Sequence, residues 1–255
     1  MGILSTRKKK KKSVLLIVDR IILFALIATL ATGIVYRLLP PDPIQHAVDS
    51  TVVLFRESPE GYEVGTCSGT VISRHEDNYR VLTAAHCVGT VEDIPVFDPY
   101  TRKILGITEY FQLSRDVMFV GHDTTSERIP TTVVIVGNHD VGLDYAVLSF
   151  HSLAPFSVAQ LNYAPLKPAE KVFSVGFPEG RYKLTLFGVV ARTSVNLEIG
   201  KNLLTIQLPG SGNGSSGSAI FDESGKIRAV LVRGFDRPPG LAISIPVYDL
   251  LLGNL

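Results

Sequence analysis

The chain has 255 residues, of which 45% are apolar, so it can bury a sizeable core as one domain or as two small barrels. Its formal net charge of +1 hides an asymmetry, because six of its 25 basic residues lie among the first 12 residues. The other 19 basic residues stand against 24 acidic ones, and this net charge of −5 argues against nucleic acid as the main partner.

The N-terminal region is typical of a membrane anchor. Residues 1–13 contain Arg7 and a run of lysines, and the almost uncharged stretch 21–39 approaches the roughly 20 residues that a helix needs to cross a bilayer. Because the cations lie on the N-terminal side, the positive-inside rule predicts a basic cytoplasmic tail at 1–13 and a transmembrane signal-anchor helix at 14–39. The rest of the chain is then extracytoplasmic, either periplasmic or extracellular, and the lipid bilayer is a partner through residues 14–39.

A cleaved signal peptide is the alternative to this anchor. The apolar stretch is longer than a typical signal-peptide core, and Leu38–Pro41 stands where an Ala-x-Ala cleavage site would be expected. The uncleaved anchor is therefore favoured, and the alternative stays open. Residues 40–50 begin with closely spaced prolines, which predict a stiff Pro-rich linker between the membrane and the folded domain.

From Thr51 onwards the apolar runs are short, rich in β-branched residues and separated by Gly, Pro and Asn, which favours strands over helices. We expect strands at residues 51–56, 70–73, 80–83, 131–136, 145–150, 171–175, 184–193, 203–207, 219–221, 227–232 and 241–245. From Thr51 on, no helical pattern persists until 247–252. This spacing is typical of an all-β domain, either Greek-key barrels or a sandwich.

Three segments of this region carry the members of a catalytic triad. Residues 83–87 read Thr-Ala-Ala-His-Cys, residues 144–148 read Asp-Tyr-Ala-Val-Leu, and residues 214–218 read Gly-Ser-Ser-Gly-Ser. A serine hydroxyl is a poor nucleophile until a histidine takes its proton, and that histidine needs a carboxylate to fix its tautomer. The pattern predicts a serine hydrolase in which Ser216 is the nucleophile, His86 the general base and acid, and Asp144 the orienting carboxylate.

Each of these assignments has a plain alternative. His86 is one of six histidines and a structural role is possible for any of them. Asp140 competes with Asp144 for the carboxylate role. Residues 210–217 also have the composition of a flexible Gly/Ser linker.

The segments resemble those of the trypsin-like (chymotrypsin-fold) serine peptidases, and most closely the compact bacterial branch around HtrA and the glutamyl endopeptidases. The likeness covers about residues 51–251 and includes further matches at 65–72, 175–178 and 240–246. It implies two six-stranded Greek-key β-barrels with a short C-terminal helix: barrel 1 at about 51–151, barrel 2 at about 167–246 and the helix at 247–253. Proteins of the HtrA type usually carry a PDZ domain after the peptidase, and none is expected in a chain that stops at Leu255.

The resemblance also implies the surroundings of the nucleophile. The backbone N–H groups of Gly214 and Ser216 would form the oxyanion hole. Ser215 stands where the zymogen type of trypsin has an aspartate, which implies activation without insertion of a new N-terminus.

The resemblance further implies which residues bind the substrate side chain before the scissile bond (P1). The residues that would line its S1 pocket are Gly210, Ser211, Val232, Arg233, Gly234 and Gly240. Since Gly210 replaces the aspartate that selects lysine or arginine, we expect an uncharged, small to medium P1 residue. Arg233 leaves an acidic preference open.

Cys67 and Cys87 match positions that are bridged in many members of the family, and an even cysteine count in an exported domain favours a disulfide. Two buried thiols would be expected only if the domain faced the cytoplasm. The histidines lack metal-ligand spacing, so we expect no metal and no cofactor. The stretch between His86 and Asp144 is long for the family, which predicts an inserted loop within 92–130.

Taken together, these features predict a membrane-anchored serine endopeptidase that acts on polypeptides through an acyl-enzyme on Ser216. Two alternatives remain. The chain could be a membrane-tethered, non-catalytic binding or scaffold module of the same fold, or it could be a self-processing protease or an esterase.

Overall fold

The computed structural model describes residues 42–137, 142–196, 201–235 and 240–250. The chain divides into residues 1–42 and one compact unit, residues 43–255. The predicted cytoplasmic tail and signal-anchor helix therefore lie outside the described residues. Within the described ranges, no helix is both long enough and apolar enough to cross a membrane.

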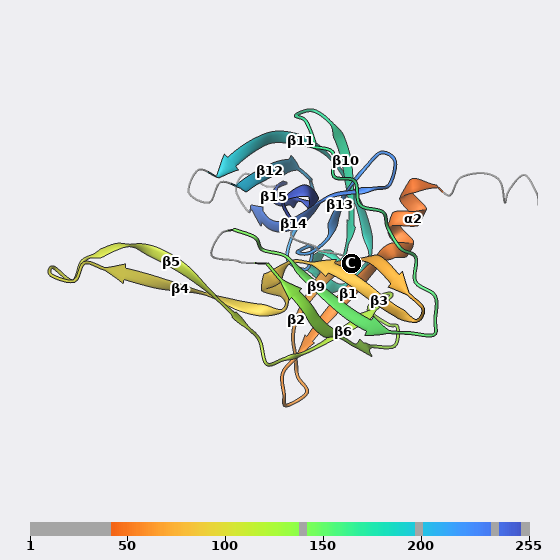
Figure 1. Cartoon of the computed structure of the whole chain (residues 1–255), viewed down its shortest axis with the longest axis horizontal. Coiled ribbons are helices and arrows are strands. Elements are labelled where there is room, and N and C mark those ends of the chain that lie inside the picture. Colours follow the sequence, from red (N-terminus) through yellow and green to blue (C-terminus); the bar gives the residue numbers. More distant parts are fainter. Residues whose placement is uncertain (1–41, 138–141, 197–200, 236–239, 251–255) are drawn as a thin grey trace, which may run out of the picture. The chain divides into compact units, whose positions relative to one another are not determined.

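The compact unit consists almost entirely of β-strands, which confirms the predicted all-β class (Figure 1). The first sheet contains β1 (Thr51–Glu57), β2 (Glu63–His75), β3 (Asn78–Thr83), β6 (Val117–Gly121), β7 (Ile129–Pro130), β8 (Thr132–Val136) and β9 (Ala146–His151). The second contains β10 (Lys171–Gly176), β11 (Leu184–Asn196), β12 (Lys201–Gln207), β13 (Ala219–Asp222), β14 (Ile227–Phe235) and β15 (Leu241–Pro246). A separate hairpin consists of β4 (Gly89–Phe97) and β5 (Ile104–Leu113).

The second sheet closes into the predicted six-stranded barrel, in the order β10-β11-β12-β15-β14-β13. Alternate side chains of its strands point inward, as the period of a strand requires. With Leu166 and Leu208, which lie just outside the strands, they form a buried cluster that contains Val172, Val190, Leu204, Ile206, Ile220, Ala229, Leu231 and Ala242.

The first sheet differs from the expected six-stranded barrel in having seven strands, in the order β7-β6-β1-β2-β3-β9-β8. The extra strand arises because one stretch of chain, 129–136, is interrupted. Its first part, β7, pairs with β6, and its second part, β8, pairs with β9. At the break, the N–H of Thr131 donates to the carbonyl of Met118 at 2.8 Å. The two ends of the sheet therefore share one stretch of chain, and the sheet curls around its own core.

A further buried cluster joins the two sheets. It includes Leu82, Tyr145 and Val147 from the first sheet region and Phe173, Val175, Phe221, Val230 and Ile245 from the second. Burying one large apolar side chain stabilises a fold by roughly 1.5–3 kcal/mol, so this cluster fixes how the two sheets pack against each other. The end of β3 and the start of β9 lie beside this cluster. The segment of His86 follows β3, and Asp144 comes just before β9.

The predicted linker at 40–50 is wrong for its second part. Residues Pro43–Ser50 form helix α2, with Ala47 and Ser50 buried. Proline is tolerated at the first helical position, where its missing N–H would have no intrahelical partner, so Pro43 starts this helix instead of preventing it. The amine of Lys183 caps the other end by donating to the carbonyls of Val48 at 2.9 Å and Thr51 at 2.7 Å.

The short helices described in the compact unit are 3-10 turns of three residues each. Three 3-10 helices are present among the described residues: η1 (Ala85–Cys87), η3 (Pro178–Gly180) and η4 (Val247–Asp249). The predicted C-terminal helix at 247–253 is thus the single turn η4, followed by Leu250 in an extended conformation. Residues 251–253 lie outside the described residues.

The expected inserted loop within 92–130 is not a single loop. It contains most of the β4–β5 hairpin and also β6, which pairs with β1 inside the first sheet. The part of this stretch that lies outside the first sheet is the hairpin, 89–113. The strand β4 was not predicted because it contains Pro95, and within sheets proline is confined to edge strands and bulges.

One half-buried carboxylate connects the inter-barrel segment to the second barrel. Asp222 accepts hydrogen bonds from the amide of Asn162 at 3.0 Å and the guanidinium of Arg228 at 3.2 Å. It also accepts from the N–H groups of Ser224 at 3.0 Å and Lys226 at 3.1 Å. Burial by itself would raise the pKa of Asp222, but these hydrogen bonds outweigh it and hold the pKa below the ordinary value of 3.8.

We predict that Asp222→Asn lowers the free energy of unfolding at pH 7 by roughly 1–3 kcal/mol, because charge-assisted hydrogen bonds are lost. Since the pKa of Asp222 is lower in the folded than in the unfolded state, its contribution is present above about pH 4 and is lost as the pH falls through the folded value. Urea unfolding at pH 7 and pH 3 should therefore show a smaller pH dependence in the variant. An equal pH dependence in both proteins would contradict this role.

Candidate active site

The predicted histidine lies on a short turn at the end of β3. His86 is the middle residue of η1, and the two preceding alanines, Ala84 and Ala85, are fully buried. The turn is held by the N–H of Cys87 donating to the carbonyl of Ala84 at 3.2 Å, and by Val88 donating to Ala85 at 2.9 Å. Small side chains before the histidine let this turn pack closely against the sheet core.

The imidazole of His86 is oriented by Asp144, which comes just before β9. The Nδ1 atom lies 2.7 Å from Oδ2 of Asp144, and the backbone N–H of His86 donates to Oδ1 at 2.9 Å. A carboxylate that accepts from Nδ1–H leaves Nε2 as the proton acceptor, which is the tautomer a general base needs. The competing residue, Asp140, lies outside the described residues.

The loop before β13 carries Ser216 in a tight turn. Gly214 and Gly217 both adopt positive φ, at 84° and 82°. A Cβ on Gly217 would lie 2.2 Å from the carbonyl oxygen of Ser68, and a Cβ on Gly214 would lie 2.4 Å from that of Phe177, so both positions require glycine. Hydrogen bonds within the loop, such as that from the N–H of Ser218 to the carbonyl of Ser215 at 3.0 Å, define its shape. The segment is a folded turn, not the linker that its composition allowed.

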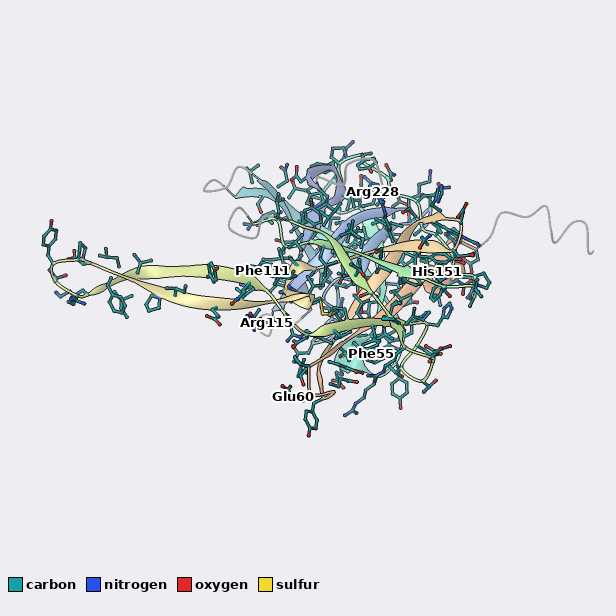
Figure 2. The ribbon with its side chains drawn as sticks, turned by 60° about the horizontal axis from the view of Figure 1, so that its bottom comes forward. Phe55, Glu60, Phe111, Arg115, His151 and Arg228 are labelled. Atoms are coloured by element: carbon teal, nitrogen blue, oxygen red, sulfur yellow. A yellow bond between two sulfur atoms is a disulfide. The ribbon has the colours of Figure 1, made fainter. Side chains whose placement is uncertain are left out.

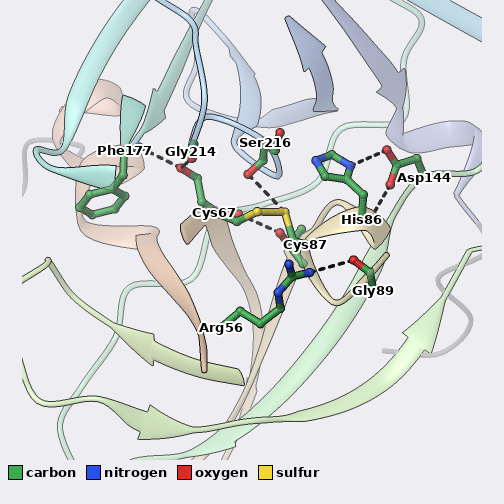
Figure 3. Close-up of a disulfide and its surroundings, with 11 residues drawn as sticks. Arg56, Cys67, His86, Cys87, Gly89, Asp144, Phe177, Gly214 and Ser216 are labelled. Carbon is green, nitrogen blue, oxygen red and sulfur yellow. Dashed lines mark hydrogen bonds and ion pairs between the residues drawn. A yellow bond between two sulfur atoms is a disulfide. The ribbon is translucent and has the colours of Figure 1, made fainter. Parts of the chain in front are cut away.

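Ser216, His86 and Asp144 line one cavity of about 560 Å³. Figure 3 shows the imidazole of His86 between Ser216 and Asp144. The structure thus brings the three predicted residues together, although they come from distant parts of the chain.

The backbone around Gly214 is arranged to receive negative charge. The carbonyl of Asn213 accepts a hydrogen bond from the N–H of Glu179 at 2.5 Å. Because the C=O and N–H of a trans peptide point in opposite directions, the N–H of Gly214 points away from Glu179. In the part of the chain that the structure describes, neither this N–H nor that of Ser216 has a hydrogen-bond acceptor. Both donors fit the predicted oxyanion hole.

Ser68, a residue to which the sequence analysis gave no role, holds this loop in place. It lies on β2 and is fully buried. Its N–H donates to the carbonyl of Ser216 at 2.8 Å, and its hydroxyl donates to the carbonyl of Gly214 at 2.8 Å. The same hydroxyl accepts the N–H of Phe177 at 2.8 Å. The segment 65–72 that resembles the family contains Ser68, but only the structure shows what this hydroxyl contacts.

The predicted disulfide is confirmed. Cys67 of β2 is bonded to Cys87 of η1, with their Cα atoms 6.0 Å apart (Figure 3). The Sγ atom of Cys87 also lies 3.7 Å from the carbonyl oxygen of Ser216. Cys67, His86 and Cys87 are close enough to suggest a metal site, but their sulfurs are bonded to each other and provide no thiolate ligand.

Four of the six residues predicted for the S1 pocket line the cavity, namely Ser211, Val232, Arg233 and Gly234. Gly210 and Gly240 do not line it. Gly210 adopts a positive φ of 89° at a turn where a Cβ would lie 3.1 Å from Leu186, and a Cβ on Gly240 would meet Pro209 at 3.3 Å. These two glycines serve the backbone turns behind the pocket, because their conformations and close neighbours both disfavour a side chain.

Four further residues line the cavity and were not predicted: Val91, Glu179, Gly212 and Asn213. Gly212 and Asn213 could have been inferred from their place just before the nucleophile. Glu179 follows the Gly176–Pro178 segment that resembles the family, but its positive φ of 58° was not predictable. Val91 belongs to β4, a strand that was not predicted, so its position in the cavity could not be inferred from the sequence.

The fold and the arrangement of the site are those of the chymotrypsin class of serine peptidases. Residues 67–230 match the model of the trypsin-like peptidase domain, and the chain therefore belongs to that family. A comparison with curated proteins gives no match.

Solved structures show the same fold. The active form of the Rv3671c protease from M. tuberculosis is 18% identical, with a TM-score of 0.57, and the match covers 80% of this chain and 78% of that one. An inactive mutant form of Rv3671c is also 18% identical, with a TM-score of 0.56 and coverages of 82% and 86%. The serine endoprotease from Yersinia pestis is 18% identical, with a TM-score of 0.57, and covers 82% of this chain and 64% of its own. At this identity the likeness concerns the fold alone.

We predict that replacing both Cys67 and Cys87 with serine lowers the free energy of unfolding by about 3 kcal/mol, because the disulfide closes a loop across 20 residues. Urea unfolding of the oxidised wild type and the double variant measures this difference. Adding a reductant should lower the stability of the wild type to that of the variant and leave the variant unchanged. A reductant that lowers both equally would contradict the prediction.

Proposed function

We propose that the chain is a serine endopeptidase that hydrolyses polypeptides through an acyl-enzyme on Ser216. The observation that carries this proposal is the pair of hydrogen bonds between His86 and Asp144, at 2.7 Å and 2.9 Å, in a cavity that Ser216 also lines. Membership of the trypsin-like peptidase family supports the same reaction.

In the proposed mechanism, Nε2 of His86 takes the proton from the hydroxyl of Ser216 as its oxygen attacks the peptide carbonyl. The carbonyl oxygen becomes negative and is stabilised by the N–H groups of Gly214 and Ser216, each worth about 3 kcal/mol in the transition state. The intermediate collapses, the C–N bond breaks, and the leaving amine takes the proton from His86. Water then attacks the acyl-enzyme in the same way and releases the acid, while Asp144 stabilises the imidazolium in both steps.

For the P1 residue we propose an uncharged, small to medium side chain. Ser211, Val232 and Gly234 are uncharged, and the side chain of Arg233 is exposed, where an ion pair contributes little. Glu179 is exposed as well, so it is not the buried carboxylate that would select lysine or arginine.

We also propose that residues 14–39 tether the peptidase to a membrane, with residues 1–13 in the cytoplasm and the catalytic domain on the other side. The support for this is the apolar stretch and the cations before it. The disulfide is consistent with that location, because disulfides persist in oxidising compartments.

Ser216→Ala should abolish covalent labelling by a fluorophosphonate probe, because the probe reacts with an activated serine hydroxyl. The matched control is Ser218→Ala, which removes a neighbouring buried hydroxyl with no hydrogen-bond partner in the described part of the chain. This control should be labelled like the wild type. An unlabelled wild type would favour a non-catalytic scaffold, and labelling without turnover of a peptide library would favour a self-processing enzyme or an esterase.

Ser68→Ala should lower kcat by about 10–100-fold and leave KM within about twofold, because the positioned oxyanion donors act mainly in the transition state. The substitution removes the hydroxyl that joins the carbonyl of Gly214 to the N–H of Phe177. Thr70→Val is the matched control, since this buried hydroxyl on the same strand has no hydrogen-bond partner among the described residues. Equal losses of kcat in the two variants would show that Ser68 contributes only to stability.

A further inference from the structure

Among the strands of the described chain, only β4 and β5 belong to neither of the two large sheets. The hairpin that they form extends away from both barrels (Figure 1). Its base is fixed by Phe111, which packs against the core of the first sheet (Figure 2). A Cβ on Gly89 would lie 2.3 Å from the ring of Phe111, so the ring sits directly on the opposite strand. The base of the hairpin is therefore rigidly connected to the segment that follows His86.

Beyond its base, the hairpin exposes large apolar side chains to solvent. These are Ile94, Val96, Phe97, Tyr100, Ile104, Leu105 and Tyr110, each at least 42% exposed. A two-stranded hairpin is only marginally stable in water, and a group of large exposed apolar side chains marks an interaction surface. This surface needs an occupant that covers it.

One face of the hairpin continues the wall of the catalytic cavity. Val91 lines that cavity together with His86 and Ser216. Since alternate residues of a strand share a face, Pro95 and Phe97 lie on the same face of β4 as Val91. Ile104 is paired with Phe97 across the hairpin and therefore shares this face. Val91, Pro95, Phe97 and Ile104 are called the cleft-side face below.

The edges of the hairpin are poorly suited to adding another strand. Pro95 in β4 has no N–H to donate to a neighbouring strand. In β5, Leu105 has no opposite residue, because the register shifts between the pairs at Val96 and Phe97. Proline and bulges are devices that prevent edge-to-edge pairing. They argue against a second copy of the chain that would extend the hairpin into a larger sheet.

The charge pattern indicates an apolar occupant. Residues 94–97 and 104–106 contain no charged side chain. The charges near the end of the hairpin are confined to its turn, at Asp98, Arg102 and Lys103. The strands carry acidic residues only nearer the base, at Glu92, Asp93 and Glu109. The outer part of the hairpin, between these acids and the turn, therefore offers uncharged side chains to a partner.

We propose that the cleft-side face is a docking surface for an extended, apolar segment of the substrate polypeptide, outside the residues that enter the catalytic cavity. This proposal rests on the proposed peptidase function and specifies its substrates as unfolded chains or chains with exposed apolar segments. Such a surface would increase affinity for long substrates without changing the chemistry at Ser216.

The test measures binding of fluorescein-labelled β-casein, an unfolded and apolar-rich protein, to the full-length chain carrying Ser216→Ala. In this background Phe97→Ser/Ile104→Ser changes the cleft-side face, and Ile94→Ser/Val96→Ser changes the opposite face as the matched control. Fluorescence anisotropy should show Kd raised about tenfold by the first pair and less than about twofold by the second. Circular dichroism checks folding, and Phe97→Ser alone replaces the first pair if the double variant is unfolded.

The outcomes separate this proposal from the peptidase function. Fluorophosphonate labelling at an unchanged rate in both hairpin variants with active Ser216 would show that the catalytic groups are intact. A wild type that is never labelled would contradict the peptidase function, while the binding data would still decide the docking proposal. Equal effects of the two pairs, or no effect of the first, would overturn it. It would also be overturned if the first pair converted an oligomer to monomers, seen by light scattering, and left casein binding unchanged.

Discussion

The position of Ser216, the proposed nucleophile, depends on a set of hydrogen bonds that Ser68 makes from the first sheet to the second barrel. Ser68 belongs to the first sheet, yet its N–H and hydroxyl bind the carbonyls of Ser216 and Gly214, each at 2.8 Å. Both carbonyls belong to half-buried residues, and a desolvated carbonyl that lost its donor would cost roughly 1–3 kcal/mol. The loop that carries the serine is therefore held by the barrel that carries the histidine, which keeps the two groups in one cavity.

This arrangement requires the barrels themselves to be fixed. The apolar cluster between them, with Tyr145 and Val147 on one side and Phe173 and Phe221 on the other, supplies a broad contact. The disulfide adds a local constraint, since it ties the turn of His86 to the residue that precedes Ser68. Apolar packing thus fixes how the two sheets lie relative to each other. The disulfide and the hydrogen bonds of Ser68 then fix where His86 and Ser216 lie within the site.

The parts of this design that could be predicted are those in which a backbone requirement or a chemical requirement restricts the residue type. Gly214 and Gly217 must be glycine because of their positive φ and close neighbours, and this restriction makes the nucleophile segment recognisable. Gly210 and Gly240 were misplaced because a conformational glycine and a pocket glycine look the same in a sequence. Helix α2 was missed because Pro43 was treated as a helix breaker, although it can begin a helix. An inserted loop was predicted within 92–130, but its hairpin form was not, because Pro95 weakens the strand pattern of β4.

The hairpin has a consequence for how related chains can vary. Its two ends leave and re-enter the first barrel side by side, because Gly89 is paired with Leu113 and the N–H of Ser114 donates to the carbonyl of Val88 at 3.0 Å. Residues added or removed between these ends would change the length of the hairpin without moving the strands of the first sheet on either side. The length and side chains of the hairpin could therefore differ between related chains while His86, Asp144 and Ser216 keep their positions.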